Sequence, residues 1–167
     1  APHAGFFRCI DAGRGMKRQQ LKAYHNIAAT TKQRGEGIGF AGVGAKLALL
    51  LATKVVTESK GGYGTRAATE WHLANPYRAP WKFIPSTDSV PSSRGTSVTM
   101  YFGDRQTHLL RPDFVRQTIT KHFYPLFHER LQTEILRFVY KKGIEFVIND
   151  TVVSLDEREQ HTDHLFR

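Results

Sequence analysis

Short apolar runs separated by turn-forming residues dominate the first two thirds of the chain, a pattern typical of a β-sheet. The first run, residues 5–11 (GFFRCID), is apolar and aromatic and ends in an aspartate before Gly13 and Gly15. It predicts a buried strand followed by a turn. Gly61 and Gly62 separate two later runs and predict a hairpin. The further predicted strands are residues 54–59, 64–73, 81–84 and 96–102.

Two segments of this region have helical spacing instead. In residues 17–29, Leu21, Tyr24 and Ile27 fall on one face and basic residues on the other, which predicts an amphipathic helix. Residues 45–52 (AKLALLLA) contain no helix breaker and predict a second, compact helix.

The last third of the chain is different in pattern. Residues 111–142 are helical in period, and Pro125 is expected to break or kink this helix. Residues 144–154 predict two short strands joined by a tight turn at Asn149 and Asp150.

Charge adds a functional indication. The chain has 24 Lys and Arg against 15 Asp and Glu, and the net charge of +9 favours an anionic partner: a nucleotide, a nucleic acid or an acidic protein. The longest strongly apolar run, residues 47–52, is far shorter than the roughly 18 residues that span a bilayer, so no membrane partner is predicted. The single cysteine, Cys9, forms no internal disulfide and favours a reducing compartment, the cytoplasm or, in a eukaryote, the nucleus.

Three glycine-bearing segments contain the candidate chemistry: residues 11–16, 37–46 and 95–96. Asp11, at a strand end, leaves a carboxylate at the sheet edge where it can accept from an amino group, while Gly13 and Gly15 let a flat ring come close. The second segment runs directly into the predicted helix. Its backbone N–H groups and the helix dipole suit a phosphate.

Two common phosphate-binding motifs are excluded. A GxGxxG pattern begins at Gly37, but a dinucleotide fold requires a hydrophobic strand immediately before it, and residues 31–36 (TKQRGE) are polar. A Walker loop requires Ser or Thr after its lysine, whereas Lys46 is followed by Leu47.

In this order, the three segments resemble the nucleotide-binding boxes of the GHKL ATPase superfamily, which contains gyrase B, the heat-shock ATPase chaperones, the MutL mismatch-repair proteins and the sensor histidine kinases. The resemblance covers roughly residues 6–102. Residues 11–16 are similar to the first glycine box, residues 35–46 to the lid and second box, and residues 95–96 to the later Gly-Thr pair.

The resemblance implies an α+β fold class: a two-layer α/β sandwich of the Bergerat type, with a mixed, mostly antiparallel sheet and helices on one face. It also implies an ATP-binding core over residues 1–105. Residues 106–167 are then a helical linker and the start of a transducer-like second domain.

The same resemblance assigns the site residues. Asp11 would bind the adenine amino group with support from Thr96, Gly15 and Met16 would form the wall against the base, and residues 31–40 would form a lid over ATP. The implied ATP-binding residues are Asp11, Gly13, Gly15, Met16, Thr31, Gly39, Gly42, Val43, Gly44, Ala45, Lys46 and Thr96.

The catalytic residue is unassigned. In the family, a glutamate that activates water and an asparagine that binds Mg²⁺ precede the first strand, and residues 1–10 contain neither residue type. The glutamate is expected upstream of Ala1, and Mg²⁺ is a cofactor implied by the family whose ligand is not in this chain. Three alternatives stay open: a truncated chain, a helix supplied by another chain, or a protein that binds nucleotide without hydrolysing it.

The leading functional hypothesis is an ATPase that binds ATP and ADP and couples lid closure to a conformational change or to homodimerisation, with DNA or a protein client as partner. The alternative is a nucleotide-responsive binding module without turnover. A kinase that passes phosphate to a histidine ranks third.

Other residues favour structural roles. The eight histidines have no metal-ligand spacing, so no metal site is predicted. Trp71, Tyr77 and Trp81 are expected in the core, although their neighbours Arg78 and Lys82 leave a nucleic-acid contact open.

Overall fold

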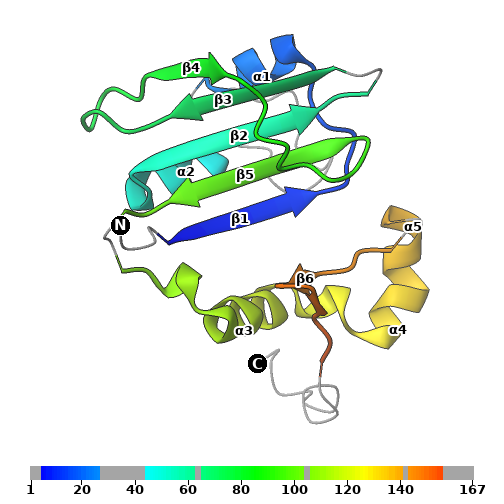
Figure 1. Ribbon diagram of the computed structural model, residues 1–167. Helices are drawn as coiled ribbons and strands as arrows, with labels where there is room; N and C mark the ends of the chain where they lie inside the picture. The colour runs from blue at the N-terminus through cyan, green and yellow to red at the C-terminus, as the bar shows by residue number, and fades with distance from the viewer. Residues whose placement is uncertain (1–4, 27–43, 63–64, 104–105, 141–142, 156–167) are drawn as a thin grey trace. The chain divides into compact units, whose positions relative to one another are not determined.

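Figure 1 shows the computed structural model, which describes residues 5–26, 44–62, 65–103, 106–140 and 143–155. The chain divides into two compact units, Ala1–Gln106 and Thr107–Arg167. Within the described residues, the first unit contains a five-stranded sheet with two helices, and the second contains short helical segments and a two-stranded hairpin.

The sheet of the first unit has the strand order β1-β5-β2-β3-β4. Its strands are β1 (Phe6–Asp11), β2 (Lys54–Lys60), β3 (Arg66–Trp71), β4 (Trp81–Ile84) and β5 (Gly95–Tyr101). All five predicted strands are therefore confirmed, but the burial predicted for the first is wrong, because β1 is an edge strand and most of its residues are exposed. The described strand pairs are all antiparallel, where a mixed sheet was expected, and the α+β fold class is confirmed.

Both helices of this unit lie on one face of the sheet, which we call the helix face (Figure 1). The first packs on β3 and β4: Leu21 is fully buried, and the ring of His25 stacks on that of Trp81 at 4.5 Å between centroids. His25 Nε2 also lies 2.9 Å from the hydroxyl of Thr69 in β3. The helices are α1 (Arg18–Tyr24) and α2 (Gly44–Leu51). The predicted second helix is thus confirmed, and the first is shorter than expected.

The opposite face of the sheet is crossed by residues 85–94, the connection from β4 to β5, which we call the strap (Figure 1). Because β4 lies at one edge and β5 lies beyond β2, the strap passes over β3 and β2. Residues 55–59 of β2 are consequently all buried. Successive side chains of a strand point to opposite faces, so Ser59 lies on the helix face and Glu58 and Lys60 lie on the strap face.

In the second unit, the helix over Pro112–His122 ends shortly before Pro125, whose ring removes a backbone donor. The break predicted at Pro125 within the helical residues 111–142 is therefore confirmed, and shorter helical segments follow it up to Val139. The tight turn predicted at Asn149 and Asp150 is confirmed, since their φ values of 47° and 65° are those of a two-residue hairpin turn. The elements are η1 (His108–Leu110), α3 (Pro112–His122), η2 (Tyr124–Leu126), α4 (Glu129–Leu131), η3 (Gln132–Leu136), α5 (Arg137–Val139), β6 (Val147–Ile148) and β7 (Thr151–Val152).

Candidate functional site

Three polar side chains lie in a row across one end of the sheet, on the helix face. Asp11, the last residue of β1, is opposite Thr96 of β5, and Thr96 is opposite Ser59 of β2. Directly opposite residues of antiparallel strands point to the same face, and their Cα atoms are roughly 4.5–5.5 Å apart. The fold therefore brings together two residues predicted from the sequence, Asp11 and Thr96, and adds Ser59, which the sequence reasoning missed.

The hydroxyl group of Ser59 joins the parts of this row. It accepts a hydrogen bond from the backbone N–H of Met16 at 2.8 Å, and it lies 3.0 Å from the Gly95 carbonyl oxygen and 3.0 Å from the Thr96 hydroxyl. A carbonyl can only accept, so the single proton of Ser59 goes to Gly95, and Thr96 donates its own proton to Ser59. The Thr96 oxygen then offers only lone pairs to a ligand.

Asp11 offers a second acceptor beside Thr96. One carboxylate oxygen, Oδ1, accepts from the backbone N–H of Gly13 at 2.8 Å, and the side chain is exposed. Among the residues that the structure describes, none donates to the other oxygen. A Cβ at Gly13 would lie 2.7 Å from Oδ1, so glycine is needed for this contact. Two acceptors side by side suit a ligand that presents an amino group.

Gly15 is required by close backbone packing, a reason that the sequence did not suggest. Its φ is +63°, and a Cβ there would lie only 1.9 Å from the backbone oxygen of Lys60. Gly95, with φ +146°, is equally constrained, since its Cβ would lie 2.1 Å from the backbone oxygen of Asp11. These glycines let the turn after β1 pack directly against the ends of β2 and β5. The close approach of a flat base ring to Gly15 stays a prediction.

The predicted phosphate-binding segment is only partly described. The helix α2 begins at Gly44, so the backbone N–H groups of Gly44, Ala45 and Lys46 belong to its first turn, as the sequence predicted. The predicted site residues Thr31, Gly39, Gly42 and Val43, and the predicted lid over residues 31–40, lie outside the described residues.

The described residues provide no metal centre: they include no group of three or more His, Cys, Asp or Glu side chains that could hold an ion. We derive no step that uses Mg²⁺. The described helices also include none that is long and apolar enough to cross a bilayer.

The aromatic residues considered for nucleic-acid contact are separated by the fold. Trp71 is 1% exposed and belongs to the core, and Trp81 stacks on His25, as the core interpretation predicted. Tyr77 is 97% exposed at the turn between β3 and β4, so its predicted place in the core is wrong. The tight turn, closed by a bond from the Arg78 N–H to the Asn75 carbonyl at 3.1 Å, explains this exposure because it projects residue 77 outward.

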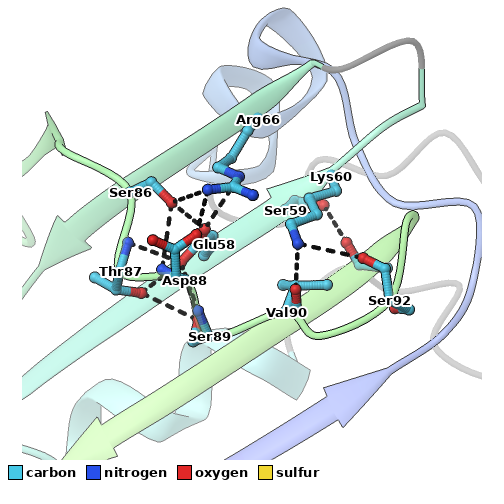
Figure 2. A network of polar contacts seen from close by, with 11 residues as sticks. Glu58, Ser59, Lys60, Arg66, Ser86, Thr87, Asp88, Ser89, Val90 and Ser92 are labelled. Atoms are coloured by element: carbon cyan, nitrogen blue, oxygen red, sulfur yellow. Dashed lines mark hydrogen bonds and ion pairs between the residues drawn. The ribbon is translucent and has the colours of Figure 1, made fainter.

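Glu58, on the strap face of β2, is fully buried, and Figure 2 shows the hydrogen bonds around its carboxylate. It accepts from Ser86 Oγ at 2.5 Å, Thr87 N at 2.9 Å, Ser89 N at 3.1 Å and Ser89 Oγ at 3.1 Å, and also from the Thr87 hydroxyl. Arg66 Nε lies 3.9 Å from the carboxylate. Burial raises the pKa of Glu58, but the hydrogen bonds from Ser86, Thr87 and Ser89 outweigh burial and lower it to about 2.

Lys60 holds the other half of the strap. Figure 2 shows its ammonium group donating to the backbone oxygen of Val90 and, at 3.3 Å, to that of Ser92. The run Thr57-Glu58-Ser59, which follows two valines in the same strand, was the sequence signal for these contacts. Polar side chains on both faces of one strand indicate that both faces are covered by hydrogen-bonding partners.

No protein-family model matches this chain, and a search of curated proteins finds no match either. The GHKL interpretation therefore stays a hypothesis that rests on the order of the sequence motifs.

Proposed function

We propose that the first unit is a nucleotide-binding domain that recognises an amino-bearing base, with ATP or ADP as the ligand. The observation that carries this proposal is the pair of neighbouring acceptors, Asp11 and Thr96, with the Thr96 proton already committed to Ser59. The exocyclic amino group of adenine has two N–H donors to offer to these oxygens. A hypoxanthine base has an acceptor oxygen at the same position and would be repelled.

In this proposal, the triphosphate binds to the second glycine-bearing segment, residues 37–46. The first turn of α2 provides the N–H groups of Gly44, Ala45 and Lys46 together with the positive end of the helix dipole. Residues 39–43 would complete the phosphate loop, and residues 31–40 would close over the ligand as a lid. Coupling of this closure to a conformational change or to homodimerisation, and DNA or a protein client as the partner, are proposals from the GHKL resemblance, as is a cytoplasmic or nuclear location.

Binding without turnover is the second candidate for this chain. The two glutamates of the central strands are engaged elsewhere: Glu58 with the strap, and Glu70 with Lys54 at 3.4 Å and Lys82 at 3.7 Å. Neither is placed to act as the general base that hydrolysis of ATP needs. Release of inorganic phosphate from ATP by the longest native form of the protein distinguishes the two candidates, because a pure binder releases none.

An Asp11→Asn substitution tests the base-binding site. The amide retains an acceptor for the Gly13 N–H but replaces a charged acceptor by an amide group that can also donate. We expect the Kd for ATP to rise about 10- to 100-fold, equivalent to about 1.5–3 kcal/mol, and the preference for ATP over ITP to fall or reverse. Calorimetric titration with both nucleotides measures this.

Glu134→Gln is the matched control, since it makes the same chemical change in an exposed ion pair of the second unit. It should leave both Kd values unchanged. Equal binding of ATP by the wild type and by Asp11→Asn would remove Asp11 from the site, and no binding of ATP by the wild type would refute the proposed function.

A further inference from the structure

The strap and the row of acceptors both contact β2, on opposite faces of the strand. Ser59 contacts Gly95 and Thr96 on the helix face. Its neighbours Glu58 and Lys60 hold the strap on the other face, as Figure 2 shows. We propose that Lys60 is a positioning residue for the base-binding end of the site, although it lies on the opposite face of the sheet and cannot touch the nucleotide. This inference rests on the proposed function.

The first step of the argument is the contact that Lys60 makes. Its ammonium group donates to the backbone carbonyls of Val90 and Ser92, and Val90 itself is 1% exposed. A charged donor on two carbonyl groups forms stronger hydrogen bonds than a neutral one. Lys60 therefore fixes the path of the strap over residues 90–92.

The second step is the short distance along the chain from Ser92 to Thr96. The Ser92 hydroxyl donates to the Arg94 carbonyl at 2.6 Å, which closes a tight turn. Gly95 follows with φ +146°, and a Cβ on it would lie 3.2 Å from Ser92 Oγ. With so little space, a displacement of Ser92 moves Gly95 and Thr96 as well.

The third step is the independent anchor of the other half of the strap. Glu58 holds Ser86, Thr87 and Ser89 by its own hydrogen bonds, so removal of the Lys60 ammonium frees residues 90–94 without releasing the whole strap. Loss of Lys60 should consequently disturb the orientation of Thr96 more than it disturbs the fold. A displaced Thr96 no longer distinguishes a donor from an acceptor on the base.

The test is Lys60→Met in the full 167-residue chain, with ATP and ITP titrated separately. We expect the Kd for ATP to rise about 5- to 10-fold and the ratio of the ITP and ATP dissociation constants to fall by a similar factor, because the selective contact is weakened. A general loss of stability would weaken the binding of both nucleotides equally and leave the ratio of their dissociation constants unchanged. Lys82→Met removes the same charge from a side chain that is 71% exposed and should change neither constant.

A second measurement uses only the wild-type protein. If the strap and the site are coupled, ATP must slow hydrogen exchange of the backbone amides in residues 90–96, since coupling between two sites is reciprocal. An unchanged ratio in Lys60→Met, or unchanged exchange in the strap on addition of ATP, would overturn the positioning role while leaving the proposed function intact. If the wild type binds no ATP, the proposed function fails, and this inference fails with it.

Discussion

The two faces of β2 bury polar groups in different ways. On the strap face, Glu58 has both carboxylate oxygens engaged by hydrogen bonds from its own chain, and the group is inaccessible to solvent. On the helix face, Ser59 is just as buried, but the row it belongs to ends in the exposed carboxylate of Asp11.

This difference separates a structural role from a binding role. A buried polar group whose hydrogen bonds are all made within the chain stabilises the fold and has nothing left for a ligand. A row whose acceptors remain open at one end can bind a donor from outside. The most strongly shifted carboxyl group of the described chain, Glu58, is thus the structural one, and the nucleotide proposal rests on Asp11.

The largest effect is expected from replacing Glu58. In Glu58→Ala, the N–H group of Thr87 and the buried N–H group of Ser89 lose their acceptor, and we expect a loss of about 3–5 kcal/mol in the free energy of unfolding. Glu58→Gln retains an acceptor oxygen for these donors, so its cost should be about 1–2 kcal/mol. Urea denaturation of the three proteins measures both values. Equal losses in the two variants would show that the strap does not depend on these bonds.

The pH dependence of stability isolates the charge of the same side chain. The pKa of Glu58 is lowered from 4.5 to about 2 in the folded protein, so its contribution to stability is fully present above pH 4.5 and is lost as the pH falls toward 2. The contribution is on the order of 2–3 kcal/mol. Denaturation midpoints of the wild type should therefore fall more steeply over this interval than those of Glu58→Gln. Parallel curves would contradict an ionised, buried Glu58.

Much of the first unit could be predicted from the sequence. Every strand of the sheet could be predicted from short runs rich in apolar and β-branched residues that are bounded by turn-forming residues. Asp11 and Thr96 were predicted from glycine-bearing motifs, and strand pairing places them opposite each other.

The parts that could not be predicted depend on contacts between distant segments. Ser59 meets Met16 and Thr96, which are 43 and 37 residues away along the chain, and no local pattern encodes such contacts. The sequence of the strap predicts only a polar loop. The strand order shows that this loop must cross β2, where its hydroxyl groups reach Glu58. The break in the helical part of the second unit could be predicted, since Pro125 has no N–H to donate, but the lengths of the segments that follow it could not.

The smallest effects are expected from removing two buried hydroxyl groups, one on each face of the sheet. Ser59 bonds to Met16, Gly95 and Thr96, so Ser59→Ala should lower the free energy of unfolding by about 1–2 kcal/mol and weaken ATP binding by roughly tenfold. Ser97, on the strap face, is equally buried, but its hydroxyl has no hydrogen-bond partner among the described residues.

Ser97→Ala removes an unsatisfied polar atom and should therefore be neutral or slightly stabilising, with no change in the Kd for ATP. The two alanine variants differ from the wild type by the same single oxygen atom, which makes them a matched pair. Thermal unfolding and calorimetric titration of both decide the comparison. If Ser97→Ala weakens ATP binding as much as Ser59→Ala does, the helix face has no special part in binding, and the row of Asp11, Thr96 and Ser59 is not the site.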